Sequence, residues 1–227
     1  MKRITKTVIV AAVALMAAAS TEAATYTGDL LLGFTSQSGN DFVVDIGQAS
    51  ALTSGQTFNL SGSLGGFNLN SVNWGIIGDK NVAGIRNVWT TTGGTSPNTV
   101  GNTAQWGQID TATKSIYSGF ITGGAGDTIT PASTDDNGWN QQTKVGGLAT
   151  QYHNVYEDPN VVGLGSASVF NLIANGSAPT SFGTFTLDSG GVVTFTAAAV
   201  PEPSTYGLLA GAGLLVICLR RQFLRRA

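Results

Sequence analysis

Side chains that can do acid–base or nucleophilic chemistry are few in this sequence of 227 residues. The single histidine, His153, is the only imidazole available as the base of a nucleophilic triad, and no recognised serine motif flanks it. It stands close to Tyr152 and Tyr156, and we expect it to be a surface or half-buried structural residue. The single cysteine excludes an intramolecular disulfide. The sequence therefore predicts no catalytic residue and no enzymatic activity.

Two pairs of adjacent acids are the only arrangement that suggests hydrolysis, Asp135 with Asp136 and Glu157 with Asp158. Glycoside hydrolases use two carboxyl groups about 5–10 Å apart, whereas adjacent acids on a loop are usually solvated turn residues. Residues 134–138 also resemble part of a Ca²⁺ loop, but the regular spacing of acids and the distal glutamate are missing. We expect an Asx-type turn there, with no metal and no cofactor.

The four tryptophans divide into two groups. Trp74 and Trp89 lie in predicted strands and are expected in the core. Trp106 and Trp139 lie among Gly, Asn and Gln residues that are typical of loops, where an exposed indole can stack on a sugar ring. The alternative is that each caps one end of the fold.

Charge excludes one class of partner. Between residues 24 and 200 there are four basic and eleven acidic residues, which gives a net charge of −7 against −2 for the full chain. Four cations cannot form a basic face, so we expect no binding to nucleic acid.

The same segment has the composition of a β-protein, rich in Gly, Thr, Ser and Asn with short β-branched runs. The clearest pattern is a period of two on both sides of Gly190 and Gly191, which predicts a hairpin. A second hairpin is predicted with its turn at residues 36–40, and residues 78–81 are predicted to join two further strands. Residues 166–174 fit a short helix or a strand. The predicted strands cover residues 26–34, 41–46, 56–60, 72–77, 82–91, 115–122 and 184–197.

Short strands at this spacing, without a strong helical period, predict an all-β fold for residues 24–199. We expect an antiparallel β-sandwich or a jelly-roll-like domain. A turn or two of helix is plausible within residues 138–155, and residues 92–103 and 123–138 are predicted loops.

The N-terminus has the three parts of a secretory signal peptide. Cations at Lys2, Arg3 and Lys6 precede a 12-residue apolar run, and small residues surround a cleavage site after Ala23. The run is too short to span a bilayer, so residues 1–23 are predicted to be removed.

The C-terminus has three parts in a fixed order. Pro201, Glu202 and Pro203 precede a predicted transmembrane helix at about residues 204–219. Four arginines follow and are predicted to stop transfer and stay in the cytoplasm: Arg220, Arg221, Arg225 and Arg226. The two prolines favour an extended backbone that a peptidase can grip.

This order resembles the PEP-CTERM sorting signal of exported proteins in Gram-negative bacteria, here over residues 200–227. The resemblance implies recognition of Pro201, Glu202 and Pro203 by an exosortase, a membrane peptidase that cuts near this motif. It also implies transient anchoring in the inner membrane, and an association with exopolysaccharide and biofilm matrix. The segments DLLLGF, VNWGIIG and FGTFTLDSGGVVTFTA also resemble segments of exported proteins that carry this signal, which implies a β-rich extracellular domain.

Three functions are compatible with these observations. The first is an exported envelope or matrix protein without enzymatic activity, displayed after sorting. The second is a glycan-binding module that uses Trp106 and Trp139. The third, a secreted hydrolase, is disfavoured by the single histidine and the few acidic residues.

Removal of the signal peptide is directly testable. Because the apolar run is too short to remain as a span, we expect envelope-derived protein to begin at Ala24 or Thr25. Mass spectrometry of the N-terminal peptide measures this, and recovery of Met1 from that fraction would contradict it.

Overall fold

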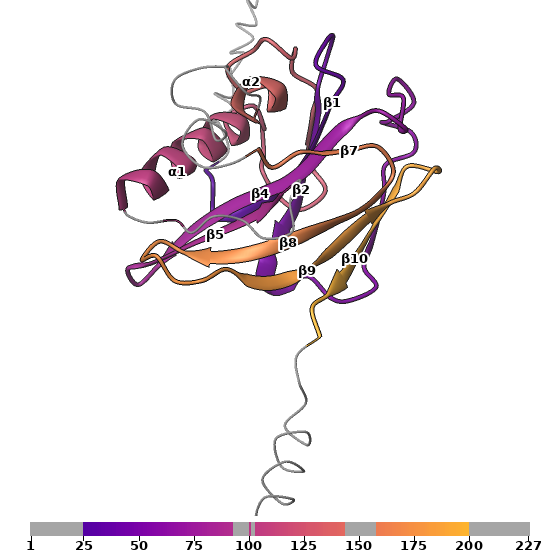
Figure 1. Ribbon diagram of the computed structural model, residues 1–227. Coiled ribbons are helices and arrows are strands. Elements are labelled where there is room, and N and C mark those ends of the chain that lie inside the picture. The colour runs from indigo at the N-terminus through magenta and orange to yellow at the C-terminus, as the bar shows by residue number, and fades with distance from the viewer. Residues whose placement is uncertain (1–24, 93–99, 101–102, 144–157, 200–227) are drawn as a thin grey trace, which may run out of the picture.

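The computed structural model describes residues 25–92, 100, 103–143 and 158–199. They form one sheet with two helices on one side of it (Figure 1). The elements in chain order are β1 (Asp29–Thr35), β2 (Phe42–Gln48), the 3₁₀ turn η1 (Ala49–Ala51), β3 (Thr57–Asn59), β4 (Asn73–Val82), β5 (Ile85–Thr91), α1 (Thr103–Tyr117), β6 (Thr128–Ile129), α2 (Trp139–Thr143), β7 (Val161–Val162), β8 (Gly165–Ile173), β9 (Thr180–Leu187) and β10 (Val192–Ala197).

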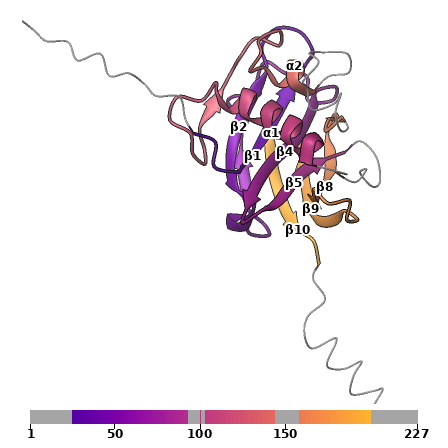
Figure 2. The ribbon, with the colours of Figure 1, turned by 90° about the vertical axis from the view of Figure 1, so that its left-hand side faces the viewer.

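All ten strands belong to one continuous antiparallel sheet. Its order is β3-β10-β9-β8-β5-β4-β1-β2-β6, and β7 pairs with β4 off this path. The sheet curves into a half-barrel, so that strands from its two halves contribute to the same core. Figure 2 shows α1 crossing the side of the sheet formed by β1, β4 and β5.

The first core fills the inside of the curve. Along β1, Leu30, Leu32 and Phe34 point inward, and β9 and β10 contribute Phe185 and Phe195 from the other half of the sheet. This is the period of two expected of strands with one apolar face. Leu60 and Leu64, from the segment after β3, complete the cluster.

The second core lies between the outer face of the sheet and the helices. Helix α1 contributes Ile109, Ala112, Ile116 and Tyr117, whose spacing places them on one helical face. They pack with alternate residues of the central strands, Leu31, Val43, Ile77, Val88 and Leu172.

Strand β1 is buried on both faces, and a glycine makes this possible. Gly33 lies on the outer face directly beneath the fully buried indole of Trp139 in α2, and a Cβ at this position would overlap the ring. The indole Nε1 donates a hydrogen bond to Asn160 Oδ1 at 2.8 Å. Asp41, just before β2, accepts a hydrogen bond from the backbone N–H of Asn140 at 2.7 Å and so holds the first turn of α2.

Several predictions are confirmed. The all-β antiparallel class is correct, and both predicted hairpins form, β1 with β2 and β9 with β10. Residues 166–174 resolve as a strand, because β8 pairs on both sides, with β5 and β9.

Other predictions are wrong. The fold is a single curved sheet, not two stacked sheets, because β5 and β8 pair and join the two halves. The turn expected at residues 78–81 lies at Ala83 and Gly84, which both have positive φ (51° and 86°), as a two-residue hairpin turn requires. The strand expected at residues 115–122 is the end of α1 and the turn after it.

The predicted signal peptide and the predicted transmembrane helix lie outside the described residues. In the part of the chain that the structure does describe, neither helix is long and apolar enough to cross a membrane.

The contact between Gly33 and Trp139 makes a prediction about stability. Gly33→Ala is expected to lower the free energy of unfolding by about 1–3 kcal/mol, because the indole would have to leave its position on β1. Gly107→Ala is the matched control. No atom lies within 4 Å of a Cβ there, and alanine favours the helix, so it is expected to stabilise slightly. Urea unfolding measures both, and equal stability of the two variants would contradict the packing argument.

Candidate functional site

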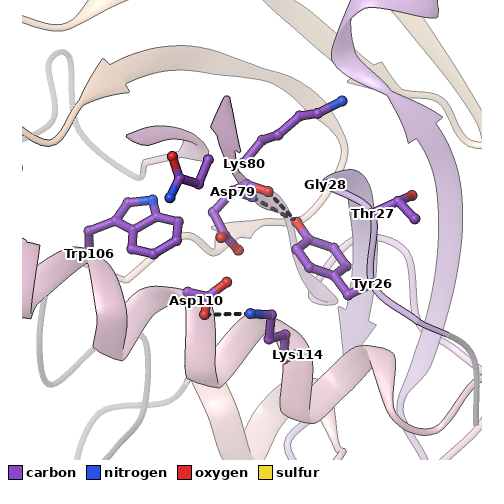
Figure 3. Close-up of a pocket in the computed structure, with 9 residues that line it drawn as sticks. Tyr26, Thr27, Gly28, Asp79, Lys80, Trp106, Asp110 and Lys114 are labelled. Atoms are coloured by element: carbon purple, nitrogen blue, oxygen red, sulfur yellow. Dashed lines mark hydrogen bonds and ion pairs between the residues drawn. The ribbon is translucent and has the colours of Figure 1, made fainter. Parts of the chain in front are cut away.

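A pocket of about 330 Å³ lies where the segment before β1 and strand β4 meet helix α1 (Figure 3). Its lining includes two acidic and two basic side chains. The residues are Tyr26, Thr27, Gly28, Asp79, Lys80, Asn81, Trp106, Asp110 and Lys114. It holds the most perturbed carboxyl group among the described residues, and perturbed carboxyl groups in a pocket are candidates for function.

Two carboxyl groups face each other across the pocket. Asp79 lies on β4 two residues after Ile77, so the strand presents both on the outer face, and Asp110 follows Ile109 on the buried side of α1. Figure 3 shows the two carboxyl groups pointing toward one another. Asp79 is 1% exposed. Burial, and next the neighbouring Asp110, raise the pKa of Asp79 to about 8.

Other groups surround the pair. Lys114 Nζ contacts Asp110 Oδ2 at 2.7 Å, one helical turn along α1, and its side chain is 53% exposed. The hydroxyl of Tyr26 accepts a hydrogen bond from Asp79 N at 2.8 Å and lies 2.9 Å from Asp79 O, to which it donates. Burial raises the pKa of Tyr26 well above its ordinary value, so the hydroxyl keeps its proton. Lys80 extends away to Gln48 Oε1 at 2.6 Å.

This arrangement lies where α1 packs on β4. The buried Asp79 faces Asp110, and Asp110 is itself paired with Lys114 on the helix. With its raised pKa, Asp79 keeps its proton at neutral pH, and Asp110 beside it pairs with Lys114. In the described ranges, no group of three or more His, Cys, Asp or Glu side chains is placed to hold a metal ion.

The two tryptophans predicted to stack on sugar are not on loops. Trp139 is fully buried in the second core, so this part of the prediction is wrong: the indole is needed to cover β1. Trp106 lies in the first turns of α1 and is half-buried. Its Nε1 donates to Asn87 O at 3.3 Å, and the guanidinium of Arg86 lies 5.6 Å from its ring centroid. Trp74 and Trp89 belong to the first core as expected, Trp74 fully buried and Trp89 partly.

A second buried acid lies near the β2 edge of the sheet. Asp45 is fully buried and accepts a hydrogen bond from Gly47 N at 2.8 Å. Burial, and to a smaller extent the charges of Asp29 and Asp127, raise its pKa to about 6. Its charge also acts on Tyr117 at the end of α1, where burial, and next Asp45, raise the pKa of the tyrosine to about 12, so Asp45 lies where β2 meets the helix.

The acidic pairs named from the sequence are local turn residues where the structure describes them. Asp135 accepts a hydrogen bond from Ala132 N at 3.0 Å, and Asp136 is exposed. Asp158 accepts from both nitrogens of Asn160, at 2.8 and 2.7 Å. The remaining predicted site residues lie outside the described residues: His153, Glu157, Pro201, Glu202, Pro203, Arg220, Arg221, Arg225 and Arg226.

The comparisons with known proteins address the end of the chain. Residues 199–222 match the PEP-CTERM protein-sorting motif. The chain carries a PEP-CTERM sorting signal. The resemblance seen in the Pro-Glu-Pro, apolar and arginine segments is therefore confirmed, over a region that begins two residues after β10. Comparison with curated proteins and with solved structures finds no match.

The pair of Asp79 and Asp110 was not predicted, although one signal for it exists. Residues 109, 112, 113, 116 and 117 have helical spacing, and recognising it would have placed Asp110 beside the buried face of a helix. The position of Asp79 opposite it depends on which strand the helix covers, and sequence spacing does not contain this.

The raised pKa of Asp79 makes a prediction about pH. A carboxyl whose pKa is about 8 in the folded chain, against 3.8 as its ordinary value, binds its proton more tightly when folded. The contribution of Asp79 to folding stability is then fully present below about pH 4 and falls as the pH rises toward 8, by up to about 1.4 kcal/mol per pH unit. Asp79→Asn removes this titration, so the free energy of unfolding should change less between pH 5 and pH 9 than in the wild type.

The control is Asp136→Asn, an exposed carboxyl away from α1, which should keep the wild-type pH dependence. Asp45 titrates with the same sign toward pH 6 in all three proteins, so the difference between variants isolates Asp79. Parallel pH profiles for wild type and Asp79→Asn would show that the buried pair does not share a proton.

Proposed function

We propose that this protein is an exported component of the cell envelope, without enzymatic activity, whose β-domain is displayed after an exosortase-type peptidase processes its tail. The sorting motif at residues 199–222 carries the proposal. The motif suggests export, transient membrane anchoring and exosortase processing. The finer part of the proposal is that the displayed domain belongs to an exopolysaccharide or biofilm matrix.

The position of the motif relative to the fold supports this route. The last strand, β10, ends at Ala197, and Ala198 N still donates to Phe182 O at 3.1 Å. Pro201 is three residues further on, which at full extension spans only about 10 Å. A peptidase that reads Pro-Glu-Pro would therefore meet its substrate directly beside the folded domain.

The character of the domain supports a display role. Both edge strands of the sheet are very short, three residues in β3 and two in β6. Backbone bonds from neighbouring loops continue these edges, such as Gly55 N to Phe195 O and Asp45 N to Asp127 O. Short edge strands disfavour pairing between chains, which suits a domain held at high density on a surface.

Variants of the motif test the sorting step. Glu202→Ala, or the double change Pro201→Ala with Pro203→Ala, is expected to leave the tail uncut and the protein in the inner membrane, because the peptidase loses its recognition residues. Ser177→Ala, at an exposed position outside the motif, is the control and should be processed normally. Deleting residues 206–227 should release the protein to the periplasm. Cell fractionation and intact-mass measurement follow each variant. If the Pro-Glu-Pro variants are processed like the wild type, the tail acts only as a membrane anchor and the sorting proposal is wrong.

A further inference from the structure

Half of the sheet carries a row of hydroxyl groups on its outer face. The strand register places Ser166 of β8 opposite Thr186 of β9, Thr186 opposite Thr194 of β10, and Thr194 opposite Thr57 of β3. The hydroxyls of Ser166 and Thr186 lie 2.9 Å apart. Four neighbouring strands therefore present a β-hydroxyl side chain at the same level, about 4.8 Å apart across the sheet.

A second row runs parallel to the first. Two residues along each strand, Ser168 lies opposite Thr184, and Thr184 lies opposite Thr196. Two residues of antiparallel strand correspond to about 6.8 Å, so the two rows form a regular array. We call these seven residues the hydroxyl face: Thr57, Ser166, Ser168, Thr184, Thr186, Thr194 and Thr196.

This face is the continuation of the surface that the helices cover elsewhere. Along β8, Leu172 and the partly buried Phe170 pack in the second core, and Ser168 and Ser166 follow on the same face. Figure 1 shows α1 and α2 on the side of β4 and β5, with β9 and β10 away from them. Five members of the hydroxyl face are exposed, and Thr184 and Thr194, in the middle of the array, are half-buried.

Charge is absent from these strands. None of β3, β8, β9 and β10 contains Asp, Glu, Lys or Arg, whereas charged residues usually make up about a quarter or more of a protein surface. The five large hydrophobic residues that are most exposed in the described ranges all lie outside the two rows: Ile85, Ile121, Val162, Leu164 and Ile173. The seven positions of the face thus carry hydroxyl groups and no charge, and the half-buried side chains of Phe170 and Val192 border them on the same face.

We propose that the hydroxyl face binds an uncharged, extended polysaccharide. Each hydroxyl can donate one hydrogen bond and accept two, and so matches the hydroxyls of a neutral sugar chain. Threonine adds a methyl group that can contact the C–H surface of a sugar ring, and its stiff side chain loses little freedom on binding. The four strands offer no basic side chain to bind an anionic polymer and no carboxylate to bind a cation.

The repeat of the array suits a polymer. One hydroxyl contributes little in water, but a chain lying along a row meets three or four of them at once. The inference rests on the proposed matrix role, since it names the polysaccharide class and the surface that would contact it. It moves the expected sugar contact from Trp106 and Trp139 to the sheet.

Binding to insoluble and soluble neutral glucans tests the inference. The full-length chain, purified in detergent, is mixed with microcrystalline cellulose, with curdlan or with dextran, and with alginate as an anionic comparison. We expect depletion from solution, or retardation in an affinity gel, with at least one neutral glucan and none with alginate. No binding to any of the three neutral glucans would overturn the inference.

Variants locate the surface. Thr186→Lys with Thr194→Lys places two charges in the first row and should weaken binding at least ten-fold. Thr111→Lys with Thr122→Lys, exposed positions on and after α1, is the matched control and should bind like wild type. Because a lysine at the half-buried position 194 also perturbs packing, Thr186→Val with Thr194→Val gives a second test. It keeps the β-branched shape, removes two hydroxyls and should also weaken binding. Wild-type affinity in both first-row variants would overturn the inference.

Two further outcomes are separable. If the first-row lysine variant abolishes a dimer seen by sedimentation while no glucan binds, the face contacts a second copy of the chain, and the inference fails. Glu202→Ala should bind glucan like wild type, because the tail is not part of the face. Failure of sorting and failure of glucan binding can therefore be distinguished in the same set of proteins.

Discussion

Strand β1 must be buried on both faces, and the arrangement of the other elements follows from this requirement. Its inner residues, Leu30 and Leu32, need the opposite half of the sheet across the first core, so the sheet has to curve. Its outer residue Leu31 needs a cover, which α1 and α2 supply. Gly33 lets the Trp139 ring lie against the strand backbone. A single flat sheet could satisfy only one of these demands.

Covering one part of the outer face divides the molecule into two different surfaces. The strands beneath α1 contain acids such as Asp79 and Asp45, whose burial raises their pKa values to about 8 and about 6. Where the cover ends, β8, β9 and β10 are free of charge and carry Ser and Thr outward. The inner face of the same strands remains apolar, with Phe185 and Phe195 in the first core. One sheet thus supports a helix-covered half and a half that can meet a partner.

The strand-level features were predictable because period two is a local property. The hairpin of β9 and β10 was correct in its strands and turn, since each strand alternates around Gly190 and Gly191. The α1 region was misread because Ser, Thr and Gly within it suggest strands and loops, while only Ile109, Ala112, Ile116 and Tyr117 mark a helical face. The turn after β4 was misplaced by several residues because Asp79 and Lys80 look like turn residues. Burial against α1 keeps Asp79 in the strand instead.

The sequence alone was sufficient for the sorting signal, because recognition of Pro201, Glu202 and Pro203, a short apolar segment and an arginine cluster depends on linear order. It also specified an antiparallel β-domain, because the alternation of apolar and polar residues along each strand is a property of residues close together in the sequence. Tertiary structure decided everything that depends on distant segments meeting. It placed Trp139 in the core, brought Asp79 to Asp110, and aligned Thr57 with Thr194, Thr186 and Ser166 in one row. Strand order and register set these contacts, and they are properties of the assembled sheet that no single stretch of sequence contains.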